Sequence, residues 1–199
     1  MTGDNPENGK GGHTMYTEDR NLHYFREISR IPRKSFHEKA VVDYIQRFAE
    51  ERGLRFQRDT LHNLILWAPA TPGREGEAPL MLQAHTDMVC AKEPWSTHDF
   101  LKDPIELVEE NGWLHANGTT LGADDGAGVA NILAILDEPE LSHPPLECVS
   151  PVQEEDGMGG AKGLDCSLLQ SRRMIGLDGI QEGTTIYSAS AVRGCHFEA

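Results

Sequence analysis

The stretch Leu80-Met81-Leu82-Gln83-Ala84-His85-Thr86-Asp87 decides the fold, because an apolar run ends there on a histidine and a carboxylate. A short apolar run bounded by turn residues is typical of a buried strand. Residues 146–152, before Glu154-Glu155, and residues 174–177, before Asp178, end in the same way. Open α/β sheets bind ligands beyond the carboxyl ends of their strands, so these side chains are expected to converge at one edge of a sheet.

Two amphipathic helices are predicted upstream of that stretch. Apolar residues at helical spacing favour a helix over residues 18–30, and Pro32 ends the pattern. Ser35-Phe36-His37-Glu38 has the form of a capping box, and it precedes a second helical pattern that Gly53 terminates.

Downstream, residues 105–108 and 113–116 are predicted to form a hairpin with an Asn-Gly turn. A helix rich in small residues is expected from Gly126, beside Asp124-Asp125. Strands and helices alternate without an internal repeat, which predicts an α/β fold with a mixed, mostly parallel sheet flanked by helices. The remaining predicted strands are residues 54–57, 63–67 and 184–189.

Composition narrows the classes of function. The formal charge of −14, from 32 acidic and 18 basic residues, disfavours nucleic acid and anionic membrane as partners, because both need basic surface. Residues 1–16 are polar and resemble a flexible leader rather than a signal peptide, and no apolar stretch is long enough to span a bilayer. Four widely spaced cysteines suggest neither a disulfide framework nor a zinc knuckle, so a cytoplasmic location is expected.

Each candidate cluster has a plain structural alternative. His85 and Asp87 share a face of an extended segment, so the carboxylate can orient the imidazole, although an H-x-D pattern alone is weak. Asp124-Asp125 fits an ordinary capped turn, or a carboxylate that bridges two metal ions, for which Asp124 is the better candidate.

The acidic residues after the later strands have alternatives too. Glu154 and Glu155 repel each other unless a positive charge lies near, and in an extended strand they would point to opposite sides. One could then bind metal while the other accepts a proton, or both could belong to a solvated loop. Taken alone, Asp178 fits an ordinary turn residue. It becomes a candidate metal ligand only together with the other acidic clusters.

Other chemistries lack their motifs. Gly157-Met158-Gly159-Gly160 is not accompanied by a Walker lysine pattern, so nucleotide binding is not expected. No G-x-S-x-G elbow appears, which disfavours acyl-enzyme chemistry. No role is assigned to the remaining histidines that were considered, which are His37, His62, His98, His115, His143 and His196.

Three ordered motifs, residues 82–90, 119–128 and 154–158, together resemble the aminoacyl-histidine (Xaa-His, carnosine-type) dipeptidases. These belong to the co-catalytic zinc peptidase family that also contains aminoacylases and glutamate carboxypeptidases. The match runs from about Leu22 to about Ala191 and includes Arg30-Ile31-Pro32-Arg33.

The resemblance implies a role for each residue. His85, Asp124 and Asp178 would hold one zinc, and Asp124 would bridge to a second zinc that Glu155 also binds. Cobalt or manganese could replace zinc. Asp87 would orient His85, and Glu154 would be the general base for a zinc-activated water that attacks the peptide bond.

The chain departs from the family pattern in two ways. Gln153 stands where the family often has an acidic residue, and the chain is less than half of the usual length. Residues 17–199 would therefore be the N-terminal portion of the catalytic domain. The last metal-binding histidine and the lid and dimerisation domain of a homodimeric full-length form would lie beyond position 199.

The function expected from these observations is metal-dependent hydrolysis of dipeptides, with Xaa-His dipeptides as small-peptide substrates. Two alternatives stay open. One is an N-acyl amino acid deacylase of the same family, and the other is a non-catalytic fragment that binds metal.

Overall fold

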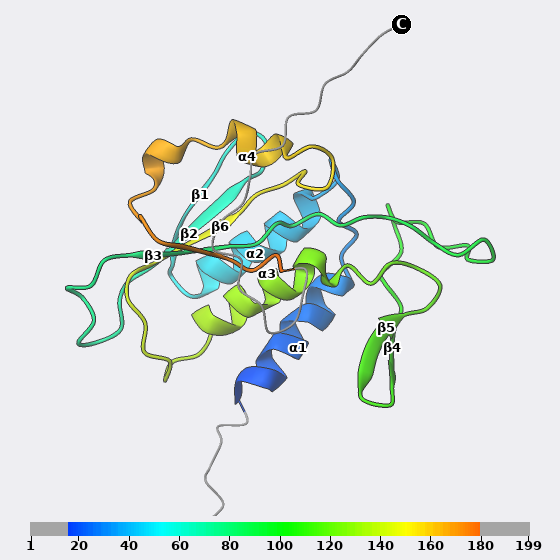
Figure 1. Ribbon diagram of the computed structural model, residues 1–199, viewed down its shortest axis with the longest axis horizontal. Coiled ribbons are helices and arrows are strands. Elements are labelled where there is room, and N and C mark those ends of the chain that lie inside the picture. Colours follow the sequence, from blue (N-terminus) through cyan, green and yellow to red (C-terminus); the bar gives the residue numbers. More distant parts are fainter. Residues whose placement is uncertain (1–15, 180–199) are drawn as a thin grey trace, which may run out of the picture.

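The computed structural model describes residues 16–179 and shows a mixed sheet with helices packed on it (Figure 1). Both residues 1–15 of the expected leader and the strand expected at residues 184–189 lie outside the described residues. The elements in chain order are α1 (Tyr16–Ser29), α2 (Lys39–Glu51), β1 (Arg55–Arg58), β2 (Leu64–Ala68), β3 (Leu80–Gln83), β4 (Leu107–Glu110), β5 (Trp113–Ala116), α3 (Ala123–Leu136), β6 (Leu146–Ser150), α4 (Gly159–Gly163), the 3-10 helix η1 (Cys166–Leu168) and β7 (Met174–Gly176).

The main sheet has the strand order β1-β2-β6-β3-β7. β1 and β2 pair antiparallel, as do β2 and β6, whereas β3 pairs parallel with both β6 and β7. The sheet is therefore mixed, as expected, and its parallel part is the part that leads to the candidate site. Because β6, β3 and β7 run in the same direction, the segments that follow them leave the sheet at the same edge.

The helices bury their apolar faces in one continuous core. α1 contributes Tyr24, Phe25 and Ile28, and the small residues of α3 let the two helices lie close together along their lengths (Figure 1). α2 packs against β1 and β2. Alternating residues of the central strands complete this core, among them Leu66 of β2 and Cys148 of β6. Among the described residues, no helix has both the length and the apolar character needed to cross a bilayer.

The start of α2 differs from the predicted capping box. Glu38 occupies the N-cap position, and no side chain makes a capping hydrogen bond there. Ser35 and Glu38 instead form hydrogen bonds with distant segments, Ser35 with Asp87 and Glu38 with Gln153. The capping-box pattern was misleading because the Ser35 hydroxyl and the Glu38 carboxylate bind distant segments instead of the backbone at the start of α2.

The predicted hairpin is present as β4 and β5, with its first strand two residues later than expected. Asn111 and Gly112 have φ angles of 53° and 79°, the left-handed values that a two-residue turn of this kind requires. The hairpin projects from the body of the molecule, away from the main sheet (Figure 1).

Candidate metal site

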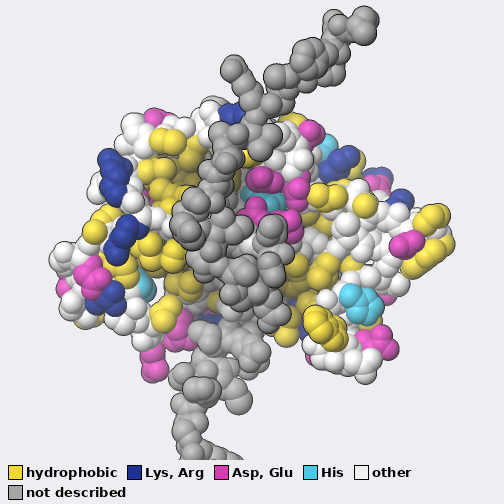
Figure 2. All heavy atoms as spheres, in the orientation of Figure 1, with side chains coloured by type: hydrophobic (Ala, Val, Ile, Leu, Met, Phe, Trp, Pro, Cys, Tyr) yellow, Lys and Arg dark blue, Asp and Glu magenta, His cyan; other side chains and the backbone are white. Residues whose placement is uncertain are grey.

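The parallel pairing continues past the ends of the strands and fixes the order of the site segments. After β3, Ala84 donates its N–H to the carbonyl of Val149, and Thr86 donates to the carbonyl of Pro151. On the other side, Leu177 donates its N–H to the carbonyl of Gln83. His85 therefore lies between the segment that leads to Glu154-Glu155 and the segment that leads to Asp178. Acidic side chains surround a histidine on this face of the molecule (Figure 2).

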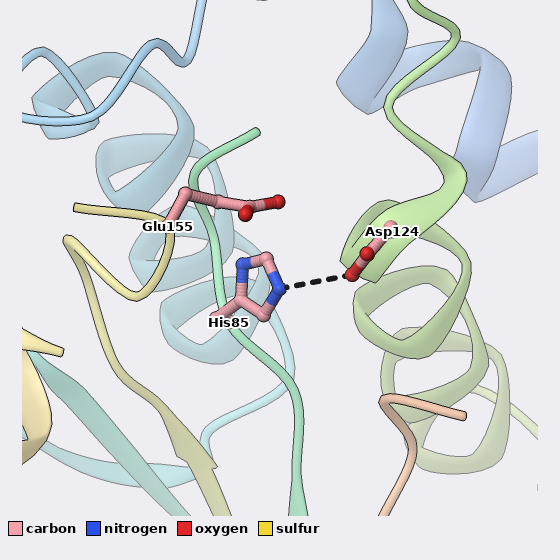
Figure 3. Close-up of side chains that lie close together, drawn as sticks. All are labelled: His85, Asp124 and Glu155. Atoms are coloured by element: carbon pink, nitrogen blue, oxygen red, sulfur yellow. Dashed lines mark hydrogen bonds and ion pairs between the residues drawn. The ribbon is translucent and has the colours of Figure 1, made fainter. Parts of the chain in front are cut away.

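His85 presents one ring nitrogen to the carboxylates. The residue is fully buried, and its Nε2 lies 3.1 Å from Oδ1 of Asp124 and 3.9 Å from Oε2 of Glu154. Figure 3 shows Glu155 reaching toward the same ring from the opposite side of the cleft to Asp124. Three carboxylates from two different segments thus lie around this nitrogen.

The other ring nitrogen of His85 faces Asp87. Nδ1 lies 3.2 Å from Oδ1 of Asp87, although the two groups are not aligned as a hydrogen bond, and Nδ1 has no other partner within residues 16–179. The imidazole and the Asp87 carboxylate are nevertheless direct neighbours. The orienting role of Asp87 stays a prediction.

Asp87 also holds the turn that carries the two glutamates. Its Oδ1 accepts the backbone N–H of Glu154 at 3.0 Å, and its Oδ2 accepts the backbone N–H of Glu155 at 3.2 Å. Oδ2 accepts a further hydrogen bond from Oγ of Ser35 at 2.7 Å. Asp87 is fully buried, so these bonds satisfy a charge that would otherwise be costly to desolvate.

Glu154 and Glu155 are arranged differently from the expectation. β6 ends at Ser150, and Gln153 has a φ of 55°, so the two glutamates lie in a turn rather than in an extended strand. Their side chains therefore do not point to opposite sides of a sheet. Each belongs to a group of candidate metal ligands that also contains His85.

Asp124 and Asp125 begin α3 and take separate roles. The Asp124 side chain is 68% exposed and faces His85, which leaves it accessible to an ion. Asp125 is buried and accepts hydrogen bonds from the backbone N–H groups of His85 and Gly128, both at 3.2 Å. Asp125 thereby fixes the start of α3 to the end of β3, a role that the sequence did not reveal.

Asp178 lines a pocket with the aspartates of α3. This pocket of about 350 Å³ is bounded by Asp124, Asp125, Ala127 and Leu177 among others. Ligand atoms lie within 4.8 Å of one another in two sets, His85 with Asp124 and Glu155, and His85 with Glu154 and Asp178. The set that the resemblance implied for one zinc, His85 with Asp124 and Asp178, is not one of the two, so the division of ligands stays a prediction.

The charges of the site are strongly coupled. Burial alone would lower the pKa of His85, but contacts with Asp87, Asp125 and Asp124 outweigh it and raise the pKa to about 9. Burial, together with neighbouring carboxylates, raises the pKa values of Glu154 and Glu155. Burial likewise raises the pKa of Asp125, to about 7. The raised pKa values of Asp125, Glu154 and Glu155 mean that their negative charges are destabilised in this site. A bound cation would stabilise those charges.

The residues fit a divalent cation. Imidazole nitrogen and carboxylate oxygen are donors that zinc accepts in catalytic sites. Among the described residues, His85 forms ion-pair contacts with Asp87, Asp124 and Glu154, and Asp124 and Glu154 form no others. Within this part of the chain, no lysine or arginine side chain therefore competes with a cation for these two carboxylates. A bound cation would relieve the repulsion among these carboxylates.

Three residues near the site were not identified from the sequence as contributors. Arg33, Ser35 and Glu38 lie between α1 and α2, and each binds a segment that carries candidate ligands. Arg33 was part of the motif that carried the resemblance, but an arginine before a helix gives no local sign of burial. Ser35 and Glu38 matched a helix cap, and nothing local distinguished that pattern from their long-range contacts.

Comparisons with known proteins agree with this arrangement. Residues 81–198 match peptidase family M20/M25/M40. The cytosol non-specific dipeptidase of Escherichia coli (strain K12) is 43% identical over 159 residues, which are 80% of this chain and 33% of that protein.

Solved structures of peptidases are also similar to this chain. The aminoacylhistidine dipeptidase from Vibrio alginolyticus superposes with a TM-score of 0.82 at 40% identity, over 85% of this chain and 34% of that one. The aminopeptidase PepT from Bacillus cereus ATCC 10987 gives a TM-score of 0.69 at 25% identity, over 81% of this chain and 43% of that one. The chain spans about a third of the length of the two dipeptidases that it matches.

Proposed function

Because this chain belongs to peptidase family M20/M25/M40, we propose that it supplies the metal site of a dipeptidase that prefers a C-terminal histidine. The observation that carries the proposal is the convergence of His85 with the carboxylates of Asp124, Glu154 and Glu155 at the carboxyl edge of the parallel strands. The names of the Escherichia coli and Vibrio alginolyticus relatives support a dipeptide substrate, and the former also supports a cytoplasmic location.

The proposed metal content is two zinc ions, with cobalt or manganese as substitutes. His85, Asp124 and Asp178 would hold one ion, and Asp124 and Glu155 would hold the second. The support for more than one ion is the number of candidate ligands, since the two sets around His85 together contain four carboxylates. Zinc bound there makes a peptide carbonyl more electrophilic and a water molecule more acidic.

Glu154 is the proposed general base. Its side chain is 30% exposed, so it is reachable by water, and burial raises its pKa, which makes the carboxylate a stronger base. In the proposed step, Glu154 accepts a proton from the attacking water as oxygen bonds to the carbonyl carbon. The carbon–nitrogen bond then breaks, and Glu154 returns the proton to the departing amine. Asp87 keeps both His85 and the glutamate turn in place throughout.

The first test compares Glu154→Gln with Asp124→Ala. Glu154→Gln should keep the bound zinc and lower turnover by roughly 10²–10⁴-fold, the usual contribution of a general base. Asp124→Ala should lose both metal and turnover. Metal content is measured after dialysis, and turnover is measured with a β-alanyl-histidine dipeptide. Equal loss of metal in the two variants would contradict the assigned roles.

Substrate class is tested with the same metal-loaded protein. Hydrolysis of Xaa-His dipeptides in preference to N-acetyl amino acids is the expected result. Preference for N-acetyl amino acids would instead identify a deacylase, and bound zinc without any hydrolysis would identify a non-catalytic metal-binding chain. Either of these results would overturn the dipeptidase proposal.

A further inference from the structure

The segment between α1 and α2 contacts the stretches of chain that bring the candidate ligands together. Arg33 is only 2% exposed, and its Nη1 donates hydrogen bonds to the carbonyls of Thr86, at 3.2 Å, and Asp87, at 2.8 Å. Its Nη2 donates to the carbonyl of Gly122. One guanidinium thus connects the segment after β3 with the segment before α3.

The start of α3 leaves space for this guanidinium. A Cβ atom at Gly122 would lie 2.5 Å from Nη2 of Arg33, and a Cβ atom at Gly126 would lie at the same distance. Any side chain at either position would displace the arginine. The two glycines therefore form a slot that Arg33 fills, with Asp124 and Asp125 lying between them in the sequence.

Ser35 and Glu38 extend the same set of contacts to the glutamate turn. Oγ of Ser35 donates to Asp87, whose carboxylate accepts the backbone N–H groups of Glu154 and Glu155. Oε1 of Glu38 accepts the backbone N–H of Gln153 at 2.9 Å. Glu38 is 4% exposed, so its carboxylate interacts with the turn and has little contact with solvent.

The free-energy cost of burying the charged Arg33 side chain has to be offset by favourable interactions. A buried charge is costly unless it is paired and hydrogen-bonded, and within residues 16–179 Arg33 makes no salt bridge at ion-pair distance. Its hydrogen bonds go to three backbone carbonyls. A rigid guanidinium fork suits that geometry, because it presents several donors in one plane at fixed angles.

We propose that Arg33, Ser35 and Glu38 form a positioning clamp that sets the spacing of the metal ligands, with Arg33 as its principal member. Arg33 fixes the separation between His85 and Asp124, and Ser35 and Glu38 fix the glutamate turn relative to both. None of the three belongs to the candidate ligand groups. The inference rests on the proposed function only in that the clamped residues are taken to bind metal.

The direct test is Arg33→Met, which keeps an unbranched stem of similar shape and removes the guanidinium donors. Co²⁺ is titrated into the full 199-residue chain, and both affinity and the visible absorption spectrum are recorded. Loss of a group that orients ligands typically weakens metal binding by roughly 10- to 100-fold, so a decrease of that size with an altered spectrum is expected. Arg30→Met is the matched control, because the Arg30 side chain is 69% exposed and pairs with Glu27.

A second pair of variants tests the clamp at Glu38 and leaves Arg33 in place. Glu38→Gln keeps an oxygen that can accept the N–H of Gln153, whereas Glu38→Ala removes it. Glu38→Gln should bind Co²⁺ with the wild-type spectrum, and Glu38→Ala should show weaker binding and a changed spectrum. This pair decides the matter if Arg33→Met does not fold, as judged by circular dichroism of the metal-free protein.

The outcomes separate this inference from the proposed function. Wild-type affinity and an unchanged spectrum in folded Arg33→Met, or equal behaviour of the two Glu38 variants, would overturn the clamp while leaving the metal site intact. Failure of the wild-type chain to bind Co²⁺ at all would instead overturn the proposed function.

Discussion

Glu147 shows at the residue scale how a buried carboxylate can hold two segments together away from the candidate site. It is 3% exposed on β6, and it accepts hydrogen bonds from Nε1 of Trp67 and from the backbone N–H groups of Gln170 and Ser171. Burial alone would raise the pKa of Glu147, but these hydrogen bonds outweigh it and lower the pKa. The residue thereby fixes the approach to β7.

The lowered pKa of Glu147 predicts a pH dependence of stability. Its contribution is fully present above the ordinary glutamate pKa and is lost as the pH falls through the lower folded-state value. Glu147→Gln should therefore lower the free energy of unfolding by about 2 kcal/mol near pH 7, and by progressively less below about pH 4. Urea unfolding of both proteins across this pH range measures the difference.

The control for that experiment is Glu110→Gln, on the projecting hairpin. The Glu110 side chain is 70% exposed, so this change should alter stability by no more than about 0.5 kcal/mol at any pH. A constant difference between wild type and Glu147→Gln across the whole pH range would contradict the assigned role of the ionised carboxylate.

At the scale of elements, the first turn of α3 has to accommodate a guanidinium. Gly126→Ala places a methyl group 2.5 Å from Nη2 of Arg33 and 3.3 Å from Cε2 of Phe25, in a region without free space. The substitution should destabilise the protein by roughly 1–3 kcal/mol, because overpacking of a close contact forces neighbours to move. Thermal and urea unfolding of the metal-free protein give the value.

Gly76→Ala is the matched control for Gly126→Ala. A Cβ atom at Gly76 meets nothing within 4 Å, so the same chemical change should be neutral or slightly stabilising there. Similar losses of stability at the two positions would show that the close approach to Arg33 does not determine the cost.

The elements themselves were predictable to different degrees. Apolar runs such as residues 80–84 and 146–150 identify central strands because those strands contribute side chains to the core. The segment 35–38 was wrongly read as a helix cap because its side chains bond to residues more than 50 positions away. The orientation of Glu154 and Glu155 was wrong for a related reason, since the left-handed Gln153 turns the chain before them.

At the scale of the whole molecule, metal binding should be coupled to stability. The candidate ligands come from four separated segments and meet only in the folded chain, so an ion that binds them stabilises the native state. At a free zinc concentration about 100 times the dissociation constant, the unfolding midpoint should rise by roughly 5–10 °C relative to protein treated with EDTA. Differential scanning calorimetry measures this shift.

Asp124→Ala provides the comparison for the calorimetric experiment. This variant should show little or no shift with zinc, while its midpoint in EDTA should stay close to that of the wild type or exceed it, because a repelling carboxylate has been removed. Identical midpoints for wild-type protein with zinc and with EDTA would contradict coupling between the site and the fold.

The sequence predicted the family and the fold class of the molecule better than the contacts that support the candidate site. Membership of the peptidase family confirms the resemblance that the three motifs indicated, and the mixed sheet confirms the fold class. His85, Asp124, Glu154, Glu155 and Asp178 do lie in the two ligand groups, whereas Arg33, Ser35, Glu38 and Asp125 came to light only from contacts. The end of an apolar strand can be recognised from neighbouring residues in the sequence. A buried hydrogen bond between distant segments produces no such local pattern.

The sheet supports its ligands unequally. β3 is paired on both sides, while β7 has three exposed residues and, among residues 16–179, pairs only with β3. Strands with few buried contacts detach at lower free-energy cost than central ones. Within residues 16–179, β7, which leads to Asp178, is therefore expected to open at lower free-energy cost than β3, which leads to His85. The pocket beside α3 thus has one side formed by the anchored start of a helix and another formed by the segment after a strand with a single described neighbour.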